Sequence, residues 1–265
     1  MEKKIHSNLS VVPEAEVEHR ADDHALKKRG IYLLPNLITT GALFSGFYAV
    51  VAGMNGQRIG ASLAIFVAMA LDTADGLVAR RTKTESQFGA QYDSLSDMVA
   101  FGVAPALVAF SSGLSGELGR IGWVITFIYM ACAALRLARF NVTTDLQRKS
   151  FTGLPSPSAA ALVACTILVW SDSYDLYSGF FPAIGLGIVT LIAGLLMVSN
   201  FKYFSPKSIN LRDRVPFVTI IFAMLIFSIL LIDPPKVLLA VAICYALSGP
   251  LGFCISYIHK SHRSV

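Results

Sequence analysis

The sequence predicts an all-α membrane protein, a polytopic helical bundle with about eight transmembrane helices. Two observations carry this prediction. Of the 265 residues, 54% are hydrophobic and only 15% are charged, whereas soluble domains average about 25% charged residues. The apolar residues also fall into blocks of roughly 20, the length that a helix needs to cross a bilayer. Because lipid offers the backbone no hydrogen-bond partners, these blocks are expected to be helices.

The apolar blocks follow one another along most of the chain. We expect spans at roughly 31–53, 59–80, 91–112, 121–140, 155–171, 180–199, 215–232 and 236–258. The third block is the weakest candidate, because its first third is polar. Pro35 lies near the start of the first block, where a missing N–H costs a helix little. Residues 27–265 are therefore expected to form one membrane domain.

Residues 1–26 are expected to form a short cytoplasmic tail. They are polar and charged, and they contain no apolar stretch of the kind found in a signal peptide. Their composition fits either a short amphipathic helix on the membrane surface or disorder.

The basic residues between the predicted spans indicate the orientation of the bundle. Only Arg58, Arg120 and Lys236 fall on one side of the membrane. The other side holds Lys27, Lys28, Arg29, Arg81, Lys83, Arg148, Lys149, Lys202, Lys207, Arg212, Arg214, Lys260 and Arg263. Cytoplasmic loops carry such an excess, so both termini are expected to be cytoplasmic, in an inner (cytoplasmic) membrane. The same distribution accounts for the net charge of +5 without a nucleic-acid partner.

Four acidic residues stand out because they lie inside predicted spans. Asp72 and Asp75 are three residues apart, and Asp93 and Asp97 are four apart, so each pair shares one face of its helix. A short basic loop joins the two helices, which are therefore expected to be antiparallel neighbours. Both pairs would then meet near the cytoplasmic end of the bundle.

Four carboxylates brought together near a membrane require cations to balance them. Ligands that are all oxygen suit hard divalent ions, namely Mg²⁺, Mn²⁺ or Ca²⁺, and two such ions could bridge the phosphates of a substrate. Two alternatives remain at this stage. The acids could form structural ion pairs within the bundle, or they could line a cation or proton pathway in an ion-coupled transporter.

Two glycines lie beside the acids. Gly76 directly follows Asp75, and Gly89 is one helical turn before Asp93. Each leaves space next to a carboxylate, either for a bulky ligand or for close packing of neighbouring helices.

These residues together resemble the signature of the CDP-alcohol phosphatidyltransferase family. The pattern D-x2-D-G-x2-A-R-x8-G-x3-D-x3-D runs from Asp72 to Asp97 with every spacing met. The resemblance implies a membrane enzyme that transfers a phosphatidyl group from a CDP-linked donor to an alcohol and releases CMP. It also implies the roles of the residues. The metal ligands would be Asp72, Asp75, Asp93 and Asp97, with Asp97 also the general base, and the CDP-binding residues would be Gly76, Ala79, Arg80 and Gly89.

The segments around the signature resemble the branch of this family that uses L-serine as the acceptor. They include "LPNLITT" at 34–40, "ALRLARFN" at 134–141 and "GLPSPSAAA" at 153–161. The resemblance therefore implies CDP-diacylglycerol and L-serine as substrates and a homodimer among membrane lipids. Glycerol 3-phosphate, inositol or an inositol phosphate remains an alternative acceptor.

A candidate acceptor site lies at the cytoplasmic end of the fourth predicted span. Arg136 and Arg139 share one helix face near Asn141, and a pair of arginines can receive a carboxylate or a lipid phosphate. The alternative is that the arginines simply extend their charges to the membrane interface. Ser94 could line the same pocket, or it could bond the carbonyl of residue 90 within its own helix.

Overall fold

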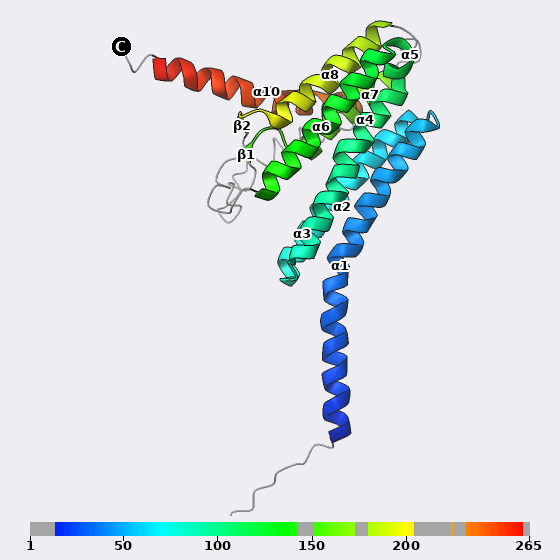
Figure 1. Cartoon of the computed structure of the whole chain (residues 1–265), viewed down its shortest axis with the longest axis vertical. Coiled ribbons are helices and arrows are strands. Elements are labelled where there is room, and N and C mark those ends of the chain that lie inside the picture. Colours follow the sequence, from blue (N-terminus) through cyan, green and yellow to red (C-terminus); the bar gives the residue numbers. More distant parts are fainter. Residues whose placement is uncertain (1–13, 143–150, 173–179, 204–223, 225–231, 262–265) are drawn as a thin grey trace, which may run out of the picture.

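The computed structural model of the chain describes residues 14–142, 151–172, 180–203, 224 and 232–261, and it is a bundle of long helices (Figure 1). Its principal helices are α1 (Glu14–Met54), α2 (Arg58–Thr82), α6 (Arg120–Val142), α7 (Ser156–Asp172), α8 (Phe180–Val198) and α10 (Pro234–Ser261). A chain of shorter helices, from Gln87 to Glu117, lies between α2 and α6. In this described part, six helices are long and apolar enough to cross a membrane, and the apolar helix α7 is shorter.

Seven of the eight predicted spans coincide with helices. The prediction for 215–232 falls outside the described residues, except for the single positions 224 and 232. Helix α1 begins at Glu14 and so crosses the expected boundary at residue 26. Its N-terminal part extends out of the bundle (Figure 1). The division into a tail and a membrane domain, and the amphipathic alternative for the tail, remain predictions.

The third span differs from the single regular helix that was expected. It begins at Gln87 and consists of α3 (Gln87–Asp97), η1 (Met98–Val103), α4 (Ala104–Ala109), η2 (Phe110–Leu114) and α5 (Ser115–Glu117). The segments η1 and η2 are π-helical. Such wide turns are rare in α-helices and frequent near functional sites. The first of them starts directly after Asp97.

Pro105 explains why the helix widens there. Proline has no N–H, so it cannot donate to the carbonyl four residues earlier, that of Phe101. In the structure the buried Tyr129 hydroxyl of α6 donates to this carbonyl at 3.0 Å. A tyrosine from the neighbouring helix therefore satisfies the acceptor that the proline releases, as a buried carbonyl requires.

Small residues let the helices around the third span approach closely. A Cβ at Gly46 of α1 would lie 2.8 Å from the Cα of Ala100, and one at Gly194 of α8 would lie 3.0 Å from the Cα of Tyr129. Contacts this short leave no room for a side chain, and small residues are typical of helix interfaces in membranes. The backbones of α1 and η1, and of α6 and α8, are thus in direct contact.

A small β-ribbon closes one end of the bundle. Strands β1 (Phe151–Thr152) and β2 (Lys202–Tyr203) pair antiparallel. Next to them, the Gly153 N–H donates to the Phe201 carbonyl at 2.9 Å, and the Leu154 N–H donates to the Leu196 carbonyl at 3.0 Å. The ribbon therefore joins the start of α7 to the end of α8.

Gly153 is the residue on which this ribbon depends most. Its φ of +83° favours glycine, and a Cβ there would collide with the Met197 carbonyl oxygen. Gly153→Ala is expected to lower the free energy of unfolding by about 1–3 kcal/mol from the backbone conformation alone. Thermal unfolding of the purified protein in detergent measures this loss. Gly116→Ala is the control, because a Cβ at Gly116 meets nothing within 4 Å. Equal stability of the two variants would contradict the prediction.

Helix α10 packs against α7 and β2, and its C-terminal half extends away from the bundle (Figure 1). The Tyr203 hydroxyl donates to the Ala246 carbonyl at 3.0 Å, and the Tyr203 ring lies directly over Gly249. The ring of Phe201 also contacts that of Phe253. The residues around β2 therefore help α7 to hold α10 to the rest of the molecule.

Candidate functional site

Helices α2 and α3 form an antiparallel hairpin, as the sequence predicted. Helix α2 ends in the αL conformation at Lys83, whose N–H donates to the Ala79 carbonyl. After a turn of a few residues, the Ser86 side chain accepts the Gly89 N–H at 3.0 Å and caps the start of α3. This tight connection brings the end of α2 beside the start of α3.

The acidic residues continue the face by which α2 packs into the bundle. Ala61, Ile65 and Ala68 are fully buried at spacings of three and four residues, and Asp72 and Asp75 extend the same series. One helix face thus changes from small apolar residues to carboxylates near its C-terminal end. The acids consequently point into the bundle and not toward lipid.

The four aspartates come together as predicted. Ligand oxygens of Asp72, Asp75 and Asp93 all lie within 4.8 Å of one another. Asp97 lies one helical turn beyond Asp93, and its carboxyl is close enough to that of Asp72 for a hydrogen bond between them. The two acid pairs therefore form one cluster across the α2–α3 interface.

This cluster fits a divalent cation by the chemistry of its donors. All of its candidate ligands are carboxylate oxygens, which hard cations prefer. The oxygens converge within a few ångströms, although like charges repel at this range. A bound cation would remove that repulsion.

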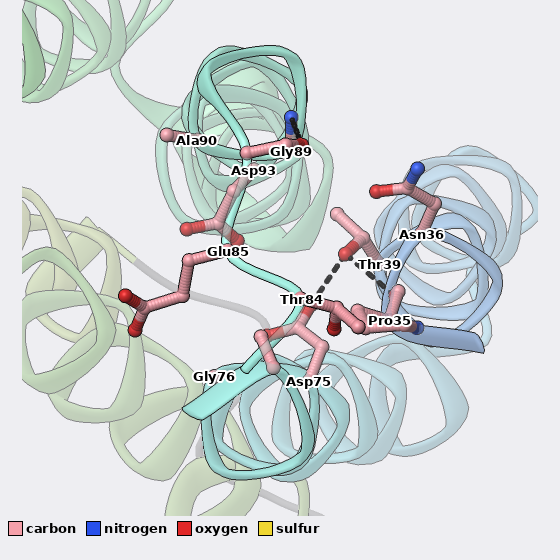
Figure 2. A pocket seen from close by; sticks show the side chains of 12 residues that line it. Pro35, Asn36, Thr39, Asp75, Gly76, Thr84, Glu85, Gly89, Ala90 and Asp93 are labelled. Atoms are coloured by element: carbon pink, nitrogen blue, oxygen red, sulfur yellow. Dashed lines mark hydrogen bonds between the residues drawn. The ribbon is translucent and has the colours of Figure 1, made fainter. Parts of the chain in front are cut away.

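A pocket of about 320 Å³ opens beside the cluster, between α1, α2 and α3. Figure 2 shows Asp75 and Asp93 facing this pocket from two different helices. Its lining residues are Pro35, Asn36, Thr39, Asp75, Gly76, Ala79, Thr84, Glu85, Ser86, Gly89, Ala90 and Asp93. The carboxylates thus stand at the wall of a cavity large enough for part of a nucleotide.

Three of the four residues expected to bind CDP line this pocket, namely Gly76, Ala79 and Gly89. The fourth, Arg80, is exposed, and its Nη2 lies 3.7 Å from the place of a Cβ on Gly76. At Gly89 a Cβ would lie 3.1 Å from the Ser86 hydroxyl, so this glycine also makes room for the helix cap. The roles of these residues toward CDP remain predictions.

The contribution of α1 to the pocket was missed by the sequence analysis. Pro35, Asn36 and Thr39 line it, and the Thr39 hydroxyl donates to Oδ2 of Asp75 at 2.7 Å (Figure 2). This contribution could have been predicted from the polar residues Asn36 and Thr39, which lie within an otherwise apolar block. Polar groups inside a span normally face the bundle interior and mark functional sites.

The candidate acceptor residues have partners in the structure. The Ser94 hydroxyl lies 3.1 Å from the Ala90 carbonyl and 3.1 Å from Oδ1 of Asn141, so its bond within its own helix is present. Arg139 donates to Oδ1 of Asn200, beyond α8, at 2.9 Å. Ser94 and Asn141 therefore meet across α3 and α6, whereas Arg139 turns toward the end of α8.

Arg136 interacts electrostatically with the acid cluster. It is partly buried, and its Nη1 donates to the Ser156 hydroxyl at the start of α7, at 3.2 Å. Its Nε is buried and has no hydrogen-bond partner among the described residues. Its charge interacts with that of Asp97. The two arginines thus have different hydrogen-bond partners, and the charge of Arg136 interacts with that of the proposed general base.

Comparison with known proteins adds a family and several relatives. The family model for CDP-alcohol phosphatidyltransferase matches residues 32–198. The chain is 37% identical over 198 residues to a CDP-diacylglycerol–serine O-phosphatidyltransferase of Helicobacter pylori, covering 74% of this chain and 82% of that protein. A protein of the same name from Methanocaldococcus jannaschii is 36% identical over 61% of this chain and 71% of its own length. An archaetidylserine synthase of Methanothermobacter thermautotrophicus is 32% identical, over 64% of this chain and 69% of its own length.

Proposed function

The chain belongs to the CDP-alcohol phosphatidyltransferase family, and we propose that it transfers the phosphatidyl group of CDP-diacylglycerol to the hydroxyl of L-serine. The products are phosphatidylserine and CMP. The observation that carries this proposal is the convergence of four aspartates from α2 and α3 beside a pocket lined by Gly76, Ala79 and Gly89. The names of the relatives support serine as the acceptor.

The donor is held at the pocket by α1, α2 and α3. Gly76, Ala79 and Gly89 have small or absent side chains, which lets the CDP group approach the backbone of both acid helices. Arg80 stands at the end of α2 beside Gly76, from where its planar guanidinium can hold a phosphate oxygen. Asp72, Asp75, Asp93 and Asp97 would hold Mg²⁺ or Mn²⁺, with Ca²⁺ as a further candidate. Bound cations, two in our proposal, would neutralise the charge that develops on the diphosphate during displacement.

Asp97 is the proposed general base. It takes the proton of the serine hydroxyl, the serine oxygen forms a bond to the β-phosphorus, and the bond from that phosphorus to CMP breaks. The Asp97 carboxylate lies one helical turn beyond Asp93, and its charge interacts with that of Arg136. Displacement at phosphorus depends mainly on positioning and charge neutralisation, and this arrangement provides both.

Arg136 is the residue best placed to receive the carboxylate of serine. Its buried Nε is a donor without a partner among the described residues, and leaving such a donor unsatisfied is costly. A carboxylate bound there would satisfy it and would place the hydroxyl of the same molecule toward Asp97. Arg139, Asn141 and Ser94 already bond to protein groups and would contribute by shaping this region.

A panel of acceptors tests the proposed function. CMP release from CDP-diacylglycerol is measured with L-serine, glycerol 3-phosphate, inositol and inositol phosphate, each with Mg²⁺, Mn²⁺ or Ca²⁺. We expect serine to exceed every other acceptor by about 10²-fold or more, because a site built to hydrogen-bond a substrate strongly rejects analogues that lack those groups. Release with serine no faster than with water would contradict the serine assignment.

The orientation of the protein is part of this proposal. The acids lie at the C-terminal end of α2, where Arg80 and Arg81 also lie, while Arg58 begins α2 at its opposite end. The excess of positive charge supports a cytoplasmic active site in the inner membrane, with both termini cytoplasmic. The clustering of acids at one end, not along a path through the bundle, disfavours the transporter alternative. A homodimer in contact with membrane lipids remains a prediction.

A further inference from the structure

Thr39 of α1 donates a hydrogen bond to an aspartate of the cluster from outside the two acid helices, α2 and α3. Its hydroxyl is 2.7 Å from Oδ2 of Asp75 and 3.0 Å from the Pro35 carbonyl, and the side chain is 4% exposed. Figure 2 shows both contacts at the wall of the pocket. Thr39 is not part of the acidic signature that runs from Asp72 to Asp97.

The Thr39 hydroxyl has one hydrogen and two acceptors. The carboxylate is the closer and the charged one, so it is the stronger acceptor. The hydrogen bond occupies one side of Oδ2 and hinders rotation of the Asp75 carboxyl. The other oxygen lone pairs of Asp75 stay directed at the cluster. The Pro35 carbonyl, at 3.0 Å, is the more distant and uncharged acceptor, so it shares the same hydrogen only weakly.

The backbone of Thr39 is itself held in place by the other acid helix. The buried Ser96 hydroxyl of α3 donates to the Thr39 carbonyl at 3.2 Å. Ser96 directly precedes Asp97. One residue of α1 therefore connects to Asp75 on α2 through its side chain and to the Asp93–Asp97 helix through its backbone.

We propose that Thr39 is a positioning residue for the cation site: its hydroxyl orients the Asp75 carboxylate and couples α1 to both acid pairs. The inference rests on the metal site in the proposed function. Partners that hydrogen-bond to metal ligands typically change metal affinity or activity by 10–100-fold when they are removed. Thr39 is such a hydrogen-bond partner of the proposed metal ligand Asp75.

The test is direct binding of Mn²⁺ to the full chain in detergent with CDP present, followed by the electron paramagnetic resonance signal of free Mn²⁺. Thr39→Val keeps the shape and removes the hydroxyl, and it is expected to weaken Mn²⁺ binding by about 10–100-fold. Thr39→Ser keeps the donor and is expected to stay within about threefold of wild type. Thr40→Val is the matched control, because Thr40 bonds the Asn36 carbonyl and Tyr92 but no aspartate.

Unchanged Mn²⁺ affinity in Thr39→Val would overturn the proposal. Equal weakening in Thr39→Ser and Thr39→Val would also overturn it, because packing of the methyl group would then be responsible. If Thr39→Val does not fold, Thr39→Ala replaces it under the same criteria. The assay uses no serine, so a failed acceptor panel leaves it intact. Absence of saturable Mn²⁺ binding in the wild type would instead overturn the metal site itself.

Discussion

Asp97→Asn is expected to lower serine-dependent CMP release by about 10²–10⁴-fold, the usual contribution of general acid–base catalysis. The amide keeps the shape of the carboxyl and one oxygen, but it cannot accept the serine proton. Because Asp72, Asp75 and Asp93 still converge, the affinity for CDP-diacylglycerol is expected to change by less than about tenfold. Turnover is followed by CMP release, and donor affinity by equilibrium binding in mixed micelles.

The control for this variant is Asp233→Asn, which removes the same charge from a residue ion-paired with Lys236 and outside the site. It should retain wild-type turnover. A fall in kcat without loss of donor binding would indicate an interaction made in the transition state. Wild-type turnover in Asp97→Asn would show that Asp97 is not the base.

Removal of divalent metal is expected to have an effect of comparable size. Chelation with EDTA should lower CMP release by about 10³-fold or more, since a bound cation contributes several kcal/mol of charge stabilisation. Donor binding should weaken too, because the carboxylates of Asp72, Asp75 and Asp93 would then face the diphosphate without a counter-charge. Both properties are measured before and after dialysis against the chelator, and again after Mg²⁺ or Mn²⁺ is restored.

The reversibility of this loss distinguishes a metal site from general destabilisation. Full recovery of CMP release and donor binding on adding Mg²⁺ or Mn²⁺ is the expected result. The depleted protein is expected to unfold at a lower temperature that the same addition restores, because a cation that binds only the folded state stabilises it. Activity that persists at metal concentrations below the micromolar range would contradict the assignment of the four aspartates.

The sequence could predict the acid hairpin because its determinants are local. Helical spacing places Asp72 with Asp75 and Asp93 with Asp97, and the short loop between α2 and α3 forces the helices to be neighbours. These features depend on residues close together in the chain. The family signature supports the same prediction, because its spacings also place each pair of aspartates on one face of its helix.

The features that were missed depend on contacts between distant helices. The π-helical turn after Asp97 follows from Pro105, but its stabilisation needs Tyr129 from α6. The proximity of Arg136 to Asp97 and of Thr39 to Asp75 arises only when α6 and α1 pack against the acid helices. Helical periodicity indicates which side of a helix is buried, but it does not identify the helix that covers it.

The central claim is that α2 and α3 together hold divalent cations for the diphosphate of a CDP-linked lipid. Anomalous X-ray diffraction from crystals grown with Mn²⁺ and CDP tests it most directly. We predict Mn²⁺ peaks among Asp72, Asp75, Asp93 and Asp97, next to the phosphates of CDP in the pocket that Gly76 and Gly89 line. CDP bound in that pocket with no anomalous peak between the two helices, at saturating Mn²⁺, would contradict the claim.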